Sequence, residues 1–185
     1  MSARRLWIIA CAVGMAVSLA ACGQVSQPTS LLNNGVYVDA GPVTYQLQVS
    51  RELNPFAAED RQYLTGLPAG TTNIGANELW YGVFLWAKNQ TGNEQSTASR
   101  FQIVDSSGNR YNPVHLDSSV NEYAWTQQTL GPSGVEPGPS TTAALGPTQG
   151  GLVLFRLPTA VYSNRPLTLE IFAPGGGTGQ ISLDL

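Results

Sequence analysis

Apolar and polar residues alternate without exception from residue 43 to residue 50 (VTYQLQVS). Successive side chains of a β-strand point to opposite faces, so a period of two predicts a strand with one buried face. Val43, Tyr45, Leu47 and Val49 are the apolar members and are expected to face the core. The pattern therefore predicts a half-buried β-strand early in the chain.

More strands are expected at short intervals along the chain. Residues 79–88 (LWYGVFLWAK) are apolar on both parities, which predicts a central strand. Residues 101–114 hold two short apolar runs joined by a turn that contains Gly108, which is typical of a β-hairpin. Three further strands are predicted, each close to a proline, at 151–157, 167–172 and 180–185.

Two segments interrupt this pattern. Residues 54–64 predict a short helix with Asn54 as its N-cap. Residues 117–150 are rich in Pro, Gly, Ser and Thr, and we expect one or two short edge strands there, near 124–130 and 142–145. Together these elements predict an all-β fold over residues 37–185, a sandwich of about seven or more antiparallel strands with one short helical insertion.

The N-terminus has the organisation of an export signal. Arg4 and Arg5 precede an uncharged run, 6–21. As a helix this run would span roughly 24 Å, which is less than the ~30 Å hydrocarbon core of a bilayer. A cleaved secretory signal is therefore favoured over a transmembrane anchor.

Residues 19–23 (LAACG) resemble the lipobox of bacterial lipoproteins. The resemblance implies cleavage between Ala21 and Cys22 and a diacylglyceryl group on the Cys22 thiol. Residues 1–21 would then be the lipoprotein signal peptide and residues 22–36 a lipidated, flexible tether. The expected location is the cell membrane, with the lipid-anchored protein facing the extracytoplasmic side. The alternative is a plain secretory signal with a chance cysteine after small residues.

Cysteine and charge content restrict the fold and the partners. Cys11 would leave with the signal and Cys22 would carry lipid, so no disulfide is expected and core packing alone must hold the fold. With 9 Lys+Arg against 12 Asp+Glu, the chain lacks a basic stripe for phosphate contacts, which argues against a nucleic-acid partner. The expected partners are the membrane, through the lipid on Cys22, and a cell-wall glycan or another envelope protein.

Over roughly residues 40–185 the chain resembles the telokin-like, immunoprotective-antigen-type extracellular domain. The resemblance rests on a strand that ends in Asn, a hairpin with Asp and Gly, and a strand that ends in Pro, at 79–89, 101–111 and 150–158. It implies an immunoglobulin-like sandwich of the kind carried by bacterial lipoproteins and secreted antigens, and it implies no catalytic residues. The insertion at 54–68 departs from the family's pattern.

The sequence offers no convincing catalytic set. His115 is the single histidine, and Asp117, Ser118 and Ser119 lie close to it in the chain. The members of a catalytic triad normally converge from separate segments, so this neighbourhood is weak support for catalysis. We therefore expect no enzymatic activity, no catalytic residue and no cofactor, and an envelope hydrolase around His115 is the least favoured alternative.

Three acidic residues leave a metal site open. Glu59 and Asp60 form an adjacent pair on the expected helix, where acids near an N-terminus are ordinary. Asp105 precedes Ser, Gly and Asn residues that suit either a calcium loop or a common turn. The helix and turn interpretations are favoured, so no metal ligand is assigned.

Aromatic residues are the candidates for ligand binding. Trp80, Phe84 and Trp86 share one parity of the 79–88 strand and are expected in the core, which leaves Tyr81 facing outward. Tyr123 and Trp125 lie in the polar loop, where exposed rings can stack on sugars or anchor a protein partner. The alternative is that these two rings cover one end of the sandwich.

These observations lead to one hypothesis and one principal alternative. The leading hypothesis is a lipid-anchored cell-envelope lipoprotein whose domain is a non-catalytic binding or structural module. The alternative is a carbohydrate- or cell-wall-binding module that uses Tyr81, Tyr123 and Trp125.

Overall fold

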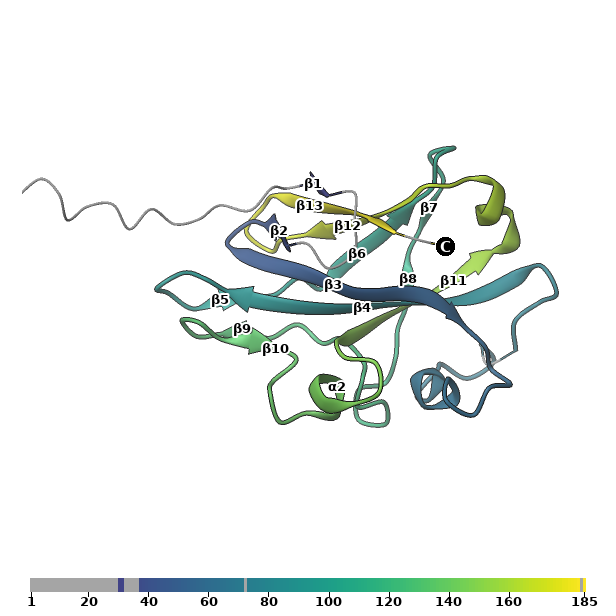
Figure 1. Cartoon of the computed structure of the whole chain (residues 1–185), viewed down its shortest axis with the longest axis horizontal. Helices are drawn as coiled ribbons and strands as arrows, with labels where there is room; N and C mark the ends of the chain where they lie inside the picture. The colour runs from purple at the N-terminus through teal and green to yellow at the C-terminus, as the bar shows by residue number, and fades with distance from the viewer. Residues whose placement is uncertain (1–29, 32–36, 72, 184) are drawn as a thin grey trace, which may run out of the picture.

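A computed structural model describes residues 30–31, 37–71, 73–183 and 185, and two β-sheets stack on each other in it (Figure 1). Sheet A has the strand order β1 (Ser30–Leu31), β13 (Thr178–Leu183), β12 (Leu167–Phe172), β6 (Arg100–Val104) and β7 (Arg110–Tyr111). Sheet B has the order β2 (Tyr37–Ala40), β3 (Val43–Leu53), β4 (Glu78–Asn89), β11 (Gly151–Pro158) and β8 (Pro113–Val114), and β10 (Val135–Glu136) also pairs with β4.

The remaining elements are short. Strands β5 (Gln95–Ser96) and β9 (Thr129–Leu130) pair with each other outside the two sheets. Among the described residues, the helical elements are two 3-10 helices and one α-helix, namely η1 (Arg61–Leu64), η2 (Thr159–Ser163) and α2 (Thr142–Leu145). Apart from the parallel pairing of β1 with β13, the strand pairs within the two sheets are antiparallel. The all-β sandwich expected from the sequence is confirmed.

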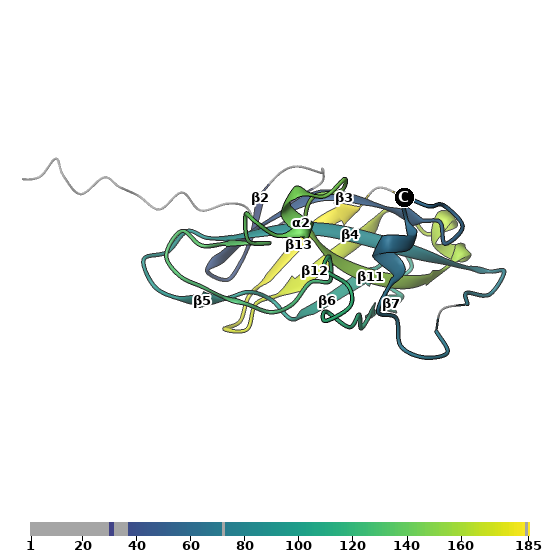
Figure 2. The ribbon, with the colours of Figure 1, turned by 90° about the horizontal axis from the view of Figure 1, so that it is seen from below.

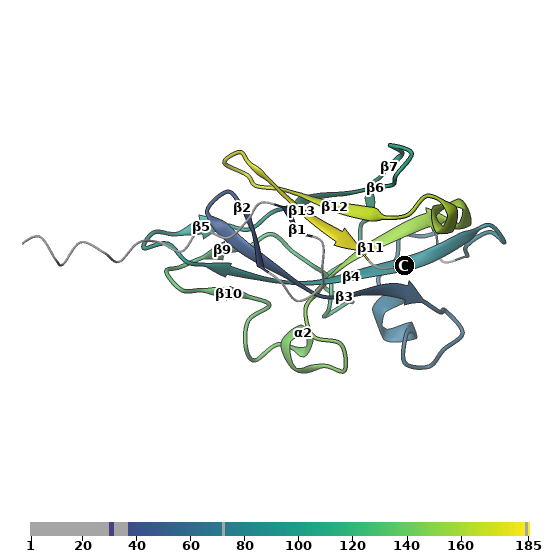
Figure 3. The same cartoon turned by 45° about the horizontal axis from the view of Figure 1, so that its top comes forward.

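Several predicted strands occur where the apolar pattern placed them. The alternating residues 43–50 begin β3, and β4 lies between β3 and β11 in the interior of sheet B. The predicted hairpin is formed by β6 and β7, with Ile103 opposite Tyr111. Figure 3 shows β6, β12 and β13 in the layer above β3 and β4.

The main core lies between the two sheets. Sheet B contributes the odd-numbered apolar residues of β4, and sheet A contributes alternate residues of β6, β12 and β13. Tyr81 belongs to this core and is 0% exposed, so the expectation that it faces outward is wrong. The odd-numbered residues of β4, which include Tyr81, face sheet A, although the even-numbered residues carry the larger rings.

A second core covers the opposite face of sheet B. Trp80 and Phe84 of β4 are buried here, beneath residues from the 54–75 and 115–145 segments. Tyr63 of η1 packs edge-on against Phe84 with ring centroids 5.0 Å apart, and against Tyr123 at 4.8 Å. Figure 2 is viewed from this side and shows η1 and α2 in front of the strands. Trp80 and Phe84 are therefore core residues as predicted, whereas Trp86 is only half-buried.

A β-bulge explains why Val49 does not face the main core. Leu47 lies opposite Leu85, but Val49 lies opposite Phe84, so Gln48 is an extra residue in β3. One extra residue moves all later side chains to the other face of a strand. Val49 accordingly packs, half-buried, against the second core.

The predicted helix at 54–64 is mostly a series of turns. The Asn54 side chain does accept a backbone N–H, that of Phe56 at 2.9 Å, but the helical part is only η1. Asp60 holds the loop closed, because it accepts the Arg51 guanidinium at 2.5 Å and the Asn54 N–H at 2.8 Å.

Of the one or two edge strands expected between 117 and 150, the one near 124–130 is present only as the two-residue β9, and the one near 142–145 is wrong. Residues 142–145 form α2 instead, and the Thr141 side chain caps this helix by accepting the Ala144 N–H. Within 124–130 the structure has β9 and one isolated bridge between Ala124 and Leu152. The loop instead contributes β10, which extends sheet B beyond the start of β11.

The N-terminal expectations concern residues that are mostly outside the described part. This applies to the signal peptide, Ala21, Cys22 and most of the tether. Ser30 and Leu31 are described, and their backbone pairs with Gln180 and Ile181 of β13. Part of the expected tether is thus a strand of sheet A. Among the residues that the structure describes, no helix is long and apolar enough to cross a membrane.

Candidate functional site

Trp125 is held against the start of β11 by backbone and side-chain contacts. Its backbone N–H donates to the Leu152 carbonyl at 2.9 Å, and its indole N–H donates to the Ala98 carbonyl at 2.8 Å. A Cβ atom at Gly151 would lie 2.7 Å from Trp125 Cε3, closer than real contacts allow. The absence of a side chain at Gly151 is therefore what permits the indole to lie on this strand.

The Trp125 ring closes one edge of the space between the sheets. Its centroid lies 5.6 Å from that of Phe101 in an edge-on arrangement and 6.1 Å from that of Tyr45. The ring is half-buried rather than free in solution. Such packing fixes the orientation of the indole, so that it can serve as a rigid wall for a ligand.

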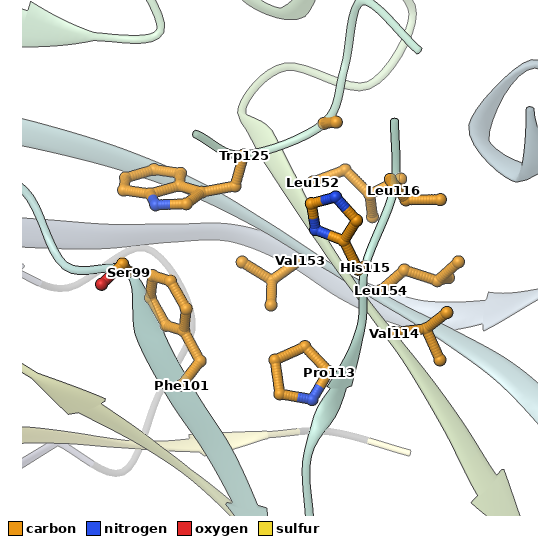
Figure 4. Close-up of a pocket in the computed structure, with 11 residues that line it drawn as sticks. Ser99, Phe101, Pro113, Val114, His115, Leu116, Trp125, Leu152, Val153 and Leu154 are labelled. Carbon is orange, nitrogen blue, oxygen red and sulfur yellow. The ribbon is translucent and has the colours of Figure 1, made fainter. Parts of the chain in front are cut away.

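Trp125 is a wall of two pockets, on which we base the candidate site. The first, named here the His115 pocket, has a volume of about 250 Å³ and opens between β6, β8 and β11. Its apolar lining includes Phe101, Pro113 and Val153. Figure 4 shows Trp125 and Phe101 on one side, His115 and Val114 on the other, and Val153 between them.

The second pocket, named here the Glu136 pocket, has a volume of about 370 Å³. It is formed by the 122–130 segment, β10 and the residues that lead into α2. Its lining combines aromatic and aliphatic side chains with hydroxyl and carboxylate groups, among them Glu122, Tyr123, Trp125, Leu130, Glu136 and Thr141. Apolar walls with a few polar groups are typical of small-molecule sites.

Glu136 is the unusual group of this pocket. It is 5% exposed, and its Oε2 atom has no hydrogen-bond partner among the described residues. Burial raises the pKa of the Glu136 carboxyl to about 7, although hydrogen bonds from the Thr97 hydroxyl and the Thr126 N–H act to lower it. A buried carboxyl with one unused oxygen is costly for a fold, which marks the position as a functional candidate.

The structure does not assemble a hydrolytic site around His115. The His115 side chain is exposed at the pocket rim, and Asp117 Oδ1 accepts the hydroxyl of Ser119 at 2.6 Å and its N–H at 2.9 Å. Figure 4 places Ser99 beside Phe101, across the pocket from His115. Within the described part, no serine or acid is hydrogen-bonded to His115, so the geometry of a triad is absent.

Of the three acidic residues considered for a metal ion, Asp60 and Asp105 have other partners. Glu59 is exposed, and Asp60 pairs with Arg51. Asp105 organises the β6–β7 hairpin, and its two oxygens accept hydrogen bonds from Ser107, Asn109, Tyr111 and Asn164. Burial raises the pKa of Asp105, but these hydrogen bonds outweigh it and lower the pKa to about 2. In the described ranges no three His, Cys, Asp or Glu side chains gather as a metal site would require.

The structure separates the three aromatic candidates. Tyr81 is buried in the main core and cannot contact a ligand at the surface. Tyr123 is 6% exposed and donates its hydroxyl to Gln62 at 3.1 Å. It packs in the second core on a face of sheet B, and it also lines the Glu136 pocket. Trp125 lines both pockets. Sequence reasoning did not single out Gly151 or Glu136 as site residues.

No family model and no curated protein sequence matches this chain. Among solved structures it is similar to yjhA of Bacillus subtilis, with 12% identity, a TM-score of 0.51, and coverage of 82% of this chain and 98% of that one. It is similar to ycdA of Bacillus subtilis, described as a candidate lipoprotein, with 9% identity, a TM-score of 0.51, and coverage of 82% of this chain but only 39% of that one. An uncharacterised β-sandwich protein of Clostridium difficile has 10% identity, a TM-score of 0.46, and coverage of 88% and 99%. The likeness to the two Bacillus subtilis proteins shows a shared fold.

Proposed function

We propose that this protein is a lipid-anchored cell-envelope lipoprotein whose immunoglobulin-like, telokin-type domain is a non-catalytic binding module. The lipobox resemblance of residues 19–23 supports the anchor, and the description of ycdA as a candidate lipoprotein agrees with it. The observation that carries the binding role is that Trp125 forms a wall of two neighbouring pockets.

A cell-wall glycan is the ligand class that suits this site best. Sugars present apolar ring faces to aromatic side chains and hydroxyls to polar groups. Trp125 and Tyr123 provide rings, while Thr126, Thr141 and the carboxylates provide hydrogen-bonding groups along the Glu136 pocket. The pockets have volumes of about 250 and 370 Å³, enough for one or two ring-sized groups each.

Replacing Cys22 with serine is expected to abolish lipid attachment, because the hydroxyl cannot replace the thiolate as the alkylated nucleophile. Cells grown with a palmitate analogue should label the wild-type protein, and the Cys22→Ser protein should carry no label. Cys11→Ser is the matched control, since Cys11 lies within the expected signal, and it should keep the label. Label retained on Cys22→Ser would reject the anchor.

Replacing Trp125 with alanine is expected to weaken binding to purified peptidoglycan by at least about tenfold, because it removes a wall shared by both pockets. A sedimentation assay over a range of peptidoglycan concentrations measures this. Trp86→Ala is the control, because Trp86 is a half-buried tryptophan that lines neither pocket. Circular dichroism confirms that each variant is folded, and Trp125→Phe provides a milder change. Equal binding by folded Trp125→Ala would refute the proposed site.

A further inference from the structure

We infer that the Glu136 pocket recognises a positively charged amino group on a small organic ligand. This inference rests on the binding role proposed above and defines the ligand's chemistry. The pocket offers a buried carboxylate whose Oε2 atom has no partner among the described residues, next to the Trp125 ring. A protonated amine supplies the hydrogen-bond donor that this oxygen lacks, and its charge matches that of the carboxylate.

The lining of the pocket favours a cation over an anion. Glu122 and Glu136 both line it, and its described lining contains no Lys, Arg or His. Lys88 lies opposite Val135 in the β4–β10 pair, but it is exposed and on the other parity from Ala87, the partner of Glu136. An ammonium group would therefore enter a pocket whose charged lining residues are both acidic, with no competing cation in the pocket wall.

Glu136 is also positioned to hold such a group in one orientation. The Gln128 N–H donates to the Thr97 hydroxyl oxygen at 2.9 Å, which leaves the hydroxyl proton free to be donated to Glu136. The Thr126 N–H provides a further hydrogen bond to this carboxyl. The carboxyl is thus fixed by groups from two loop segments, and a fixed partner loses little entropy when a ligand binds. The Trp125 ring adds a cation–π contact or an apolar surface for the ligand body.

The groups that face Glu136 give its binding a defined pH dependence. They are Thr97 and Thr126 from the loops and Tyr45 from β3, whose pKa burial raises. Glu122 is the other acidic residue of the pocket lining. Because the pKa of Glu136 is about 7, an ammonium ligand must bind the deprotonated form. Affinity is therefore full at pH 8 and is expected to fall about tenfold by pH 6.

Isothermal titration calorimetry on the purified full chain in detergent micelles tests the inference with two probes of the same shape. Cyclohexylamine, which stays protonated from pH 6 to pH 8, should bind at least about tenfold more tightly than cyclohexanol at pH 8. Glu136→Gln should remove this preference and the pH dependence. Glu59→Gln changes an exposed acid outside the pocket and should keep both. Methyl glucosaminide against its N-acetyl form shows whether an amino sugar can be the source of the amine.

The outcomes separate this inference from the proposed function. Equal affinity of the wild type for the two cyclohexyl probes, or an amine preference that survives Glu136→Gln, would overturn the ammonium site. Peptidoglycan binding that depends on Trp125 would then still support the binding module. The proposed binding function would be refuted if peptidoglycan binding did not depend on Trp125, whatever the result with the amine probes.

Discussion

Replacing Trp80 with alanine is expected to destabilise the fold by about 3–5 kcal/mol. Trp80 is 0% exposed and belongs to the second core, together with Leu53, its partner on β3, and Leu152 on β11. Its removal would leave a cavity beneath the 54–75 and 115–145 segments, which cannot close completely because interiors are tightly packed. Urea unfolding followed by circular dichroism gives the free energy of unfolding.

Trp86→Ala is the matched control for this experiment, because it removes the same side chain from the same parity of β4 at a half-buried position. It should lose less than half as much stability. Limited proteolysis should also cut the 54–75 segment faster in Trp80→Ala than in the wild type. A loss of less than about 1 kcal/mol for Trp80→Ala would mean that these segments do not form a packed layer on sheet B.

The second core also shows why the sequence predicted the strands better than their faces. A period of two at residues 43–50 has one explanation, so β3 is found where it was expected. In the 79–88 strand both the odd-numbered and the even-numbered residues are apolar. Its periodicity therefore cannot tell which of the two sets faces the other sheet. The larger rings of Trp80 and Phe84 favoured the wrong choice. Trp80 and Phe84 are buried by the 54–75 and 115–145 segments instead, and Tyr81 on the other face of β4 packs against sheet A.

Local errors in the sequence interpretation have local physical causes. Gln48 resembles any other polar residue in an alternating pattern, so the bulge that turns Val49 away becomes visible only in the pairing with β4. Residues 142–145 are too few for periodicity to separate a strand from a helix. The Thr141 side chain caps and so stabilises the helix.

The candidate site was predictable only through the two loop aromatics, Tyr123 and Trp125. An aromatic residue in a polar loop is a recognisable signal, and the structure places Trp125 in both pockets. Glu136 stands alone among Pro and Gly residues, and its burial depends on the pairing of β10 with β4, which no pattern within the loop indicates. In the sequence, Gly151 is only the first residue of the predicted 151–157 strand. Its role depends on the close approach of the Trp125 indole, which comes from a distant segment.

The stability of the wild-type protein is expected to fall by about 3 kcal/mol between pH 4.5 and pH 8, because Glu136 must ionise in a buried site. Burial raises the pKa of this carboxyl from about 4.5 in the unfolded chain to about 7 in the folded protein. Its neutral form is tolerated below pH 4.5, and stability is lost as the pH rises toward 7. Above that range both states are ionised, and the dependence on this residue ends.

Glu136→Gln keeps the shape of the neutral carboxyl but cannot ionise, so its unfolding free energy should stay nearly constant over the same range and exceed that of the wild type at pH 8. Urea unfolding at pH 5, 6, 7 and 8 measures both proteins. Asp105 acts in the opposite direction, because its lowered pKa of about 2 removes stability only as the pH falls below about 4, outside this window. A wild-type curve that is flat from pH 5 to pH 8 would show that the Glu136 carboxylate is already stabilised without a ligand.

If an ammonium ligand occupies the pocket, saturating cyclohexylamine should reduce the wild-type slope and leave that of Glu136→Gln unchanged, because only an ionised carboxylate gains a partner.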